Sequence, residues 1–314
     1  MLRFRTPVEE ESSREIQQLR QAVAQDDARL LDEMLSQEIY KRVIDCRGGW
    51  GIAGTPLRMA ASKGHLRCLQ VLLARGARVD RVDVKAQTPL FTAVCGKYLE
   101  CVLALLRAGA DPDGSAANNC SPVLTAAREG DAQILRQLLQ HGAAVNSRSR
   151  VPLWSSGASV SGGPLYLSAV YGHLECFRVL LAFGADPDYN CGEGGAPPPP
   201  PAPLSSSGRA QQPKTVLEMC LRHGCGVEYV RLLIDFGANV YLPTLIIEKT
   251  TKQNEAVELL LQERGTPKSL ASQCRLAVRG QLKRVGRIHC VDQLELPRSI
   301  IHFLEHRSAP VVVQ

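Results

Sequence analysis

Residues 55–80, TPLRMAASKGHLRCLQVLLARGARVD, contain the pattern that decides the fold. TPLFTAVCGKYLECVLALLRAGADPD starts at Thr88 and SPVLTAAREGDAQILRQLLQHGAAVN at Ser121, so the interval is 33 residues both times (88 − 55 and 121 − 88). Two more copies follow after longer gaps, GPLYLSAVYGHLECFRVLLAFGADPD from Gly163 and TVLEMCLRHGCGVEYVRLLIDFGANV from Thr215. Such a period predicts a stack of small units that bury their apolar sides against one another.

Each copy is typical of two short helices joined by a turn. Four copies open with a residue whose side chain can cap a helix N-terminus, namely Thr55, Thr88, Ser121 and Thr215. A proline suited to the first helical turn follows in four copies, as Pro56, Pro89, Pro122 and Pro164. The second helix carries paired leucines and ends at a glycine that suits the left-handed position, namely Gly76, Gly109, Gly142, Gly184 and Gly237.

This pattern resembles the ankyrin repeat, T-P-L-H-x-A-A-x-x-G-H followed by L-L and G-A, which implies an all-α solenoid. LRQAVAQDDARLLDEML (19–35) fits a capping first repeat, although Asp26 stands where glycine is usual, and residues 242–265 fit a shortened last one. We expect six to seven units over residues 17–265 after an N-terminal segment, 1–16. Insertions fall near 148–163 and 189–214. The proline run 197–201 in the second indicates either a disordered loop or a ligand for an aromatic groove.

Composition limits the class of protein. The chain has 314 residues, a net charge of +6 without a clustered basic stripe, and no apolar run long enough to span a membrane. We therefore expect a soluble, cytoplasmic protein that could also enter the nucleus, with no membrane insertion and no nucleic acid as partner. Eleven cysteines, an odd number, argue against a disulfide framework. Cys68, Cys101 and Cys176 share one position of the second helix and are expected to be small core residues.

The repeat is lost after residue 265. In SLASQCRLAVRGQL (269–282), Leu270, Cys274, Val278 and Leu282 recur every four residues and so share one face of a predicted helix. A second apolar stretch, LELPRSIIHFLEH, follows in the same tail. One interpretation is that the tail caps the last repeat. The other is that an amphipathic helix of this kind fits the groove of a partner protein.

SLxxxCR, with Val278 and Arg279 following, resembles the Elongin-binding part of a SOCS box. The resemblance implies that Leu270 inserts into a pocket of Elongin C beside Cys274, with Val278 and Leu282 continuing the contact. The later stretch is similar to the cullin-selecting part, which implies cullin-binding residues Leu296, Pro297, Ile300 and Ile301. That part often reads L-P-x-P, and Ser299 replaces its second proline here, so cullin-5 and another cullin both stay open. The box is expected over 266–308, with 309–314 as a tail.

Ankyrin repeats followed by a SOCS box identify the chain as resembling the ankyrin repeat and SOCS box family. This implies a non-catalytic substrate receptor of an Elongin B/C–cullin-5–RING-box ubiquitin ligase, in which the array binds an unknown protein for ubiquitination and proteasomal degradation. An ankyrin scaffold without a ligase role is the alternative. A metal- or thiol-dependent enzyme is a third possibility, because Cys220, His223 and Cys225 offer donor atoms. The helix-turn pattern explains those residues, however, and we expect no catalytic residue, metal or cofactor.

The turns between repeats are the expected place for substrate. Both tryptophans, Trp50 and Trp154, fall in these finger segments, and Trp is enriched at binding hot spots. Asp83 and Lys85 add charge to another finger. We list these four as candidate substrate contacts. Alternatively, each tryptophan shields its own loop and the charges are simply solvated.

Overall fold

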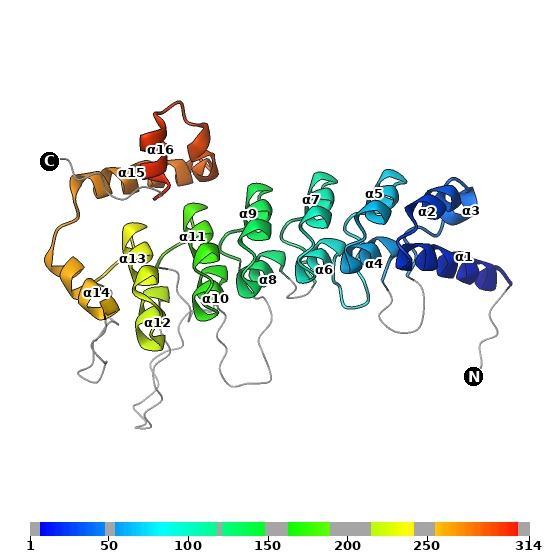
Figure 1. The fold of residues 1–314 in the computed structure, drawn as a ribbon, viewed down its shortest axis with the longest axis horizontal. Coiled ribbons are helices and arrows are strands. Elements are labelled where there is room, and N and C mark those ends of the chain that lie inside the picture. The colour runs from blue at the N-terminus through cyan, green and yellow to red at the C-terminus, as the bar shows by residue number, and fades with distance from the viewer. Residues whose placement is uncertain are drawn as a thin grey trace, which may run out of the picture. The chain divides into compact units, whose positions relative to one another are not determined.

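The computed structural model describes residues 7–47, 54–117, 121–147, 163–188, 215–241 and 255–306 (Figure 1). Every regular element in these ranges is a helix and none is a strand. The chain divides into two compact units, Met1–Val151 and Pro152–Gln314, which are described separately. The predicted all-α ankyrin architecture is confirmed.

The first unit contains four helix pairs in a row. Its elements are α1 (Pro7–Ala24), α2 (Ala28–Leu35), α3 (Glu38–Lys41), α4 (Pro56–Lys63), α5 (Leu66–Ala74), α6 (Pro89–Cys95), α7 (Leu99–Arg107), α8 (Pro122–Glu129) and α9 (Ala132–Gln140). The first helices of the pairs, α1, α4, α6 and α8, pack on one another in order, and so do the second helices, α2, α5, α7 and α9 (Figure 1). This is the stack that the repeat predicts.

The second unit continues the same construction and then departs from it. Its elements are α10 (Pro164–Val170), α11 (Leu174–Ala182), α12 (Val216–His223), α13 (Val227–Asp235), α14 (Glu255–Gly265), α15 (Leu270–Arg284), the 3₁₀ helix η1 (Ile288–Gln293) and α16 (Arg298–Leu304). α10 packs on α12, α11 on α13, and α13 on α14. α15, η1 and α16 pack on one another as a separate small group, drawn in orange and red in Figure 1.

Local chemistry sets the helix boundaries as expected. The side chain of Thr55 accepts a hydrogen bond from the Arg58 N–H at 3.2 Å, and Thr88, Ser121 and Thr215 cap α6, α8 and α12 in the same way. A left-handed residue ends each first helix or the turn after it. In the N-terminal capping repeat, which precedes the first full repeat at Thr55, this residue is Asp26, with φ of 56°. A short polar side chain tolerates that conformation better than most.

Carboxylates join neighbouring repeats, a feature that the sequence analysis did not anticipate. In each case an aspartate at the end of one repeat accepts a backbone N–H of the next. The pairs are Asp45 with Arg78, Asp80 with Asp111, Asp113 with Ala144, and Asp188 with Asn239, at 2.8–3.3 Å. Burial raises the pKa of Asp80 and of Asp188. These bonds help to hold the register of the stack.

Some boundaries differ from those expected. α1 begins at Pro7, so one helix runs through the expected border between residues 16 and 17. The short helix α3 was not foreseen. Cys68, Cys101 and Cys176 are buried, which confirms that they are core residues. The proline-rich insertion (189–214) and nearly all of the first insertion (148–162) lie outside the described residues.

Candidate protein-binding surfaces

α15 carries an outward apolar stripe. Ser269 caps the helix by accepting the Ser272 N–H at 3.2 Å. Leu270 is 76% exposed, Val278 is 41% exposed, and Cys274, one turn from each, is exposed as well. Leu282 is half-buried. A spacing of four residues advances about 40° around the helix at each step, so the stripe turns toward the covered side by its fourth member.

The opposite face of α15 buries two arginines. Arg279 donates from Nη2 to the carbonyl oxygens of Leu181 and Ala182, at 3.1 and 2.8 Å, and from Nη1 to that of Leu304, at 3.1 Å. Leu181 and Ala182 end α11 and Leu304 ends α16, where carbonyls lack the usual helical N–H partner four residues on, although that of Leu181 accepts the Gly184 N–H at 3.0 Å. One guanidinium therefore closes two helix ends at once and ties α15 to the fourth repeat and to α16.

Aromatic rings complete this inner contact. The guanidinium carbon of Arg279 lies 4.7 Å from the centre of the Phe236 ring, and that of Arg275 lies 4.5 Å from the Phe303 ring, which suits cation–π attraction. Phe236 also stacks on His306 with ring centres 4.0 Å apart. Burial lowers the pKa of Arg279 to about 10, so this side chain stays charged at neutral pH.

Two closing glycines of the array receive side chains from the C-terminal group. A Cβ added at Gly237 would lie 3.1 Å from Cδ2 of Leu276, and one at Gly184 would lie 3.2 Å from Cδ1 of Ile288. Both glycines have positive φ, near 90°. Because glycine has no side chain, Gly237 and Gly184 can end their helices and also leave room for Leu276 of α15 and Ile288 of η1. The C-terminal group rests on the ends of α11 and α13.

A sequence signal for this docking was present but was not used. Phe183 and Phe236 precede the closing glycines of the fourth and fifth repeats, where the three preceding repeats have Arg75, Ala108 and His141. A large apolar residue at that otherwise variable place indicates a covered surface. The buried Arg275 and Arg279 were counted in the SOCS-box resemblance, but their inward direction was not predicted.

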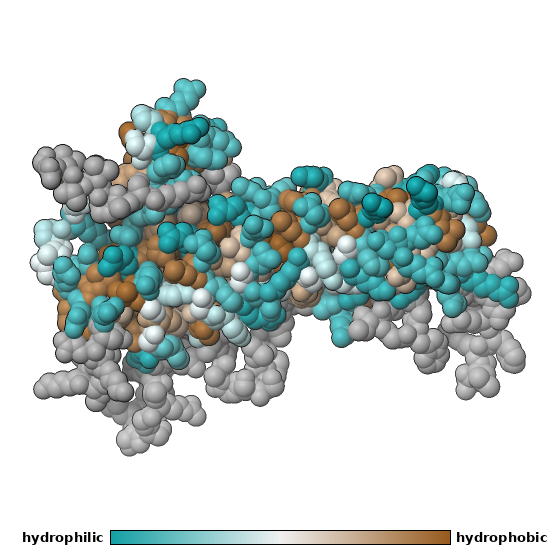
Figure 2. All heavy atoms as spheres, viewed as in Figure 1, coloured by the Kyte–Doolittle hydropathy of each residue, from teal (hydrophilic) through white to brown (hydrophobic). Residues whose placement is uncertain are grey.

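A second apolar surface lies where the chain enters α16. Leu296 and Ile300 are 40% and 43% exposed, Pro297 is exposed, and Ile301 is half-buried. Leu304, one turn after Ile300 on α16, is buried. Figure 2 shows brown, hydrophobic atoms among teal ones on this C-terminal group, at the top of the view. Most of the predicted Elongin- and cullin-binding residues are thus exposed, on α15 and around the start of α16, whereas Leu282 and Ile301 are half-buried.

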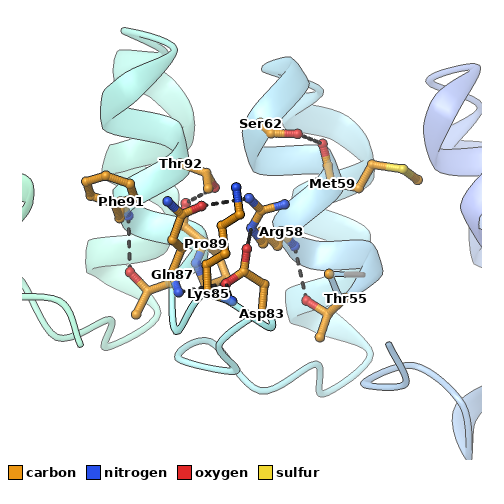
Figure 3. A network of polar contacts seen from close by, with 12 residues as sticks. Thr55, Arg58, Met59, Ser62, Asp83, Lys85, Gln87, Pro89, Phe91 and Thr92 are labelled. Atoms are coloured by element: carbon orange, nitrogen blue, oxygen red, sulfur yellow. Dashed lines mark hydrogen bonds and ion pairs between the residues drawn. The ribbon is translucent and has the colours of Figure 1, made fainter. Parts of the chain in front are cut away.

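The finger before α6 corrects one expectation. Asp83 is only 2% exposed, because its carboxylate accepts the backbone N–H groups of Lys85 and Gln87 and pairs with Nε of Arg58 at 3.0 Å (Figure 3). Arg58 also donates to Oε1 of Gln87 at 2.9 Å. Asp83 therefore shapes its own loop and offers no surface to a substrate. Lys85 is exposed and remains a candidate.

The other expected features divide between the described and undescribed parts. Trp50 and Trp154 lie outside the described residues. Within the described ranges, no three or more His, Cys, Asp or Glu side chains gather as metal ligands would. No described helix is long and apolar enough to cross a membrane. What the geometry offers is protein-binding surface on a helical stack.

Comparison with protein families agrees with this division of the chain. The model for ankyrin repeats in three copies matches residues 19–116, and the single ankyrin repeat model matches 118–150 and 163–191. The SOCS box model matches residues 266–305.

Relatives match along almost the whole chain. Ankyrin repeat and SOCS box protein 12 of Mus musculus is 57% identical over 95% of this chain and 94% of its own length, and the Homo sapiens protein is 54% identical over the same shares. Ankyrin repeat and SOCS box protein 1 of Mus musculus is 42% identical over 88% of this chain. The crystal structure of the human ASB11 ankyrin repeat domain shares the fold, with a TM-score of 0.54 and 24% identity over 84% of this chain and all of that one. The chain therefore belongs to the ankyrin repeat and SOCS box family.

Proposed function

We propose that this protein is the substrate-recognition adaptor of an Elongin B/C–cullin-5–RING-box ubiquitin ligase. The observation that carries the proposal is the outward direction of Leu270 and Cys274 on α15. A leucine exposed to this extent gains about 1.5–3 kcal/mol when a partner buries it. Such a stripe at helical spacing fits a groove on another protein.

The buried face of α15, which carries Arg275 and Arg279, supports this role because it holds the helix in place before a partner binds. Arg279 joins α15 to α11 and α16 through three carbonyl bonds, and Arg275 packs on Phe303. A helix held in this way loses little conformational freedom on binding, which improves affinity. Elongin C would contact Leu270, Cys274 and Val278, with Leu282 at the edge.

The surface around α16 is the proposed cullin contact. It comprises Leu296, Pro297, Ile300 and Ile301. α16 packs directly against α15 through the bond from Arg279 to Leu304, so one small group of helices presents both surfaces. Two separate sets of exposed apolar residues suit two partners that bind the same group simultaneously.

The repeat array would then hold the substrate, with Lys85, Trp50 and Trp154 as candidate contacts. Catalysis would reside in the other ligase subunits. This chain would raise the effective concentration of the substrate's lysines near the ubiquitin carrier. Degradation by the proteasome would follow.

The decisive experiment truncates the exposed side chains of Leu270 and Cys274 and leaves the buried arginines of α15 unchanged. We expect Leu270→Ala with Cys274→Ala to abolish co-purification of Elongin B/C with the full chain, while melting remains as in the wild type. The matched control is Arg284→Ala, an exposed position on the same helix outside the stripe. Recovery of Elongin B/C by the double variant at the wild-type level would refute the proposal.

A terminal-cap role is the second candidate, and the contacts of Leu276 and Ile288 with Gly237 and Gly184 favour it. The two roles use opposite faces of α15 and are compatible. Truncation at residue 265 should lower the melting temperature under either reading, so it does not separate them. The two roles are separated by a variant that melts like the wild type but no longer binds Elongin B/C, because only the adaptor role predicts that result.

A further inference from the structure

The fifth repeat has a pair of cysteines at the end of its first helix. Gly224 is left-handed, with φ of 67°, and the Cys225 N–H donates to the Cys220 carbonyl at 2.9 Å. This is the Schellman arrangement, in which the residue after the glycine contacts the residue three places before the helix cap. The two cysteines occupy those contacting places. Cys220 is buried and Cys225 is half-buried.

The pairing of cysteines is specific to this repeat. The same backbone bond closes the first helix of the other repeats, but their residue pairs are Ala60–His65, Ala93–Tyr98, Ala126–Asp131 and Ser168–His173. Helix closure therefore does not require sulfur at either place. The fifth repeat combines a standard turn with two thiols that the turn forces together.

Cys225 also reaches the preceding repeat. Its thiol donates to the Ala169 carbonyl at 3.9 Å, a distance at which a sulfur donor still bonds. In the first full repeat the equivalent His65 uses Nδ1 to contact the Val23 carbonyl at 2.7 Å. The thiol therefore occupies the place of an inter-repeat contact between α10 and the turn after α12.

The thiol of Cys225 has different chemistry from those of the core cysteines Cys68 and Cys101. Burial raises the pKa of Cys68 to about 12 and that of Cys101 to about 11, which leaves both unreactive. A hydrogen bond from Cys220 lowers the pKa of Cys225 to about 7, despite partial burial. Cys225 is therefore more readily ionised than an ordinary cysteine, and the thiolate is the form that attacks an oxidant.

We propose that Cys220 and Cys225 form a redox-active dithiol, which a hydroperoxide converts to an intramolecular disulfide beside the seam between the fourth and fifth repeats. The Cys225 thiolate attacks the terminal peroxide oxygen, the O–O bond breaks, and sulfenic acid and water (or an alcohol) form. Cys220 then attacks the Cys225 sulfur, the S–O bond breaks, and a second water leaves as the S–S bond forms. Two thiols are oxidised by two electrons and one peroxide is reduced. A thiol reductant reverses the reaction.

The disulfide would remove the thiol proton that Cys225 shares with Ala169. Ala169 is followed by Val170 and Tyr171, which are both exposed at the end of α10. The modified turn therefore lies next to an apolar part of the array surface. This inference is independent of the proposed ligase role.

Peptide mapping of the wild-type full chain tests the proposal directly. Arg222 lies between the two cysteines, so trypsin places Cys220 in the peptide 215–222 and Cys225 in 223–231. After treatment with hydrogen peroxide, quenching with catalase and alkylation of free thiols, we expect these peptides to be joined and to separate on reduction. Recovery of Cys225 in the alkylated form, or joined to Cys176, would overturn the proposal.

Variants separate the two steps. In Cys220→Ser the hydroxyl can still donate a hydrogen bond to Cys225 but cannot form a disulfide, so a 1,3-diketone reagent should label the sulfenic acid at Cys225 and the joined peptide should disappear. Cys225→Ser should lose both signals. The control Cys95→Ser removes an exposed cysteine of another repeat and should leave the joined peptide unchanged. No label at Cys225 in Cys220→Ser, or loss of the joined peptide in Cys95→Ser, would contradict the mechanism.

Discussion

α13 and α15 belong to the same unit but bury opposite kinds of side chain. α13 buries Val230 and Leu233 completely, as an amphipathic helix of a soluble protein should. α15 buries Arg275 and Arg279, and Leu270 is largely exposed. A prediction from hydrophobicity alone would bury Leu270 and expose Arg275 and Arg279, which is the reverse of what the structure shows.

The difference follows from what each helix packs against. α13 lies between the apolar sides of α11 and α14, so burying leucine there removes water from both surfaces. α15 rests on helix ends, where the last carbonyls can accept hydrogen bonds from donors outside the helix. The fork of Arg279 supplies such donors to Leu181, which also accepts the Gly184 N–H, and to Ala182. The polar inner face leaves the apolar residues outside and available to a partner.

The largest expected effect compares the same substitution on the two helices. Leu233→Ala should lower the free energy of unfolding by about 2–5 kcal/mol, because it leaves a cavity in a fully buried place. Leu270→Ala should change it by less than about 0.5 kcal/mol, as is usual for an exposed position. Urea denaturation of both variants measures this. A loss from Leu270→Ala as large as that from Leu233→Ala would mean that the stripe packs inward.

The next effect concerns Arg279, which is a buried contact of α15 as Leu233 is of α13. Arg279→Ala should cost about 2–3 kcal/mol, since it removes charged hydrogen bonds and leaves helix-end carbonyls unpaired. Hydrogen exchange at the ends of α11 and α16 should show the loss. Arg279→Lys should restore only part of it, because an ammonium cannot reach several carbonyls and also stack on Phe236.

Arg284→Ala provides the matched control for that substitution, because Arg284 is an exposed arginine of the same helix. Its exchange pattern should remain that of the wild type. Elongin B/C should still bind the Arg279→Ala chain more strongly than the stripe double variant, since Leu270 and Cys274 are retained. The reverse order would assign partner binding to the inner face.

The array was predictable because its rules are local. Helix caps such as Thr55, first-turn prolines and closing glycines each report a backbone requirement within a few residues, and repetition multiplies that information. The stripe from Leu270 to Leu282 was equally visible from spacing, whereas the candidate cullin contacts were implied by the resemblance to a SOCS box. Their exposure is a separate question, because spacing shows which residues share a face and does not show which face is covered.

Features that depend on contacts between distant residues were missed. Asp83 looked like an exposed finger charge, but Arg58, 25 positions earlier (83 − 58), holds it in the loop. Arg279 meets Leu181 across 98 positions. No pattern within one repeat encodes such pairs. Phe236 before its closing glycine was the nearest available signal, and it gains meaning only once the docking of α15 is known.

A smaller effect depends on pH and concerns His306, which follows α16 and stacks on Phe236. Burial, and then the charges of Arg275, Arg279 and Arg178, lower the pKa of His306 to about 3. Because the unfolded chain binds this proton near pH 6.5 and the folded chain does not, stability is complete above pH 6.5 and falls toward pH 3. At pH 5 the expected loss is about 2 kcal/mol, or 1.36 kcal/mol for each pH unit below 6.5.

His306→Asn isolates that contribution, since asparagine also tolerates the left-handed φ of 57° at this position. The free energy of unfolding of the variant should fall less between pH 7.5 and pH 5 than that of the wild type. Equal pH dependence of the two proteins would show that His306 is accessible to protons in the folded chain. α13 carries no histidine, so Leu233→Ala should shift the curve without changing its slope.

The smallest effect on stability belongs to the second exposed group. Leu296→Ala with Ile300→Ala should change the free energy of unfolding by less than about 0.5 kcal/mol for each residue, because both residues are exposed, at 40% and 43%. Cullin-5 should nevertheless be lost from pull-downs while Elongin B/C remain. Loss of Elongin B/C together with the cullin would mean that the two surfaces act as one. Unchanged recovery of cullin-5 would show that Leu296 and Ile300 do not form its contact, although α16 stays attached to α15 through the bond from Arg279 to the Leu304 carbonyl.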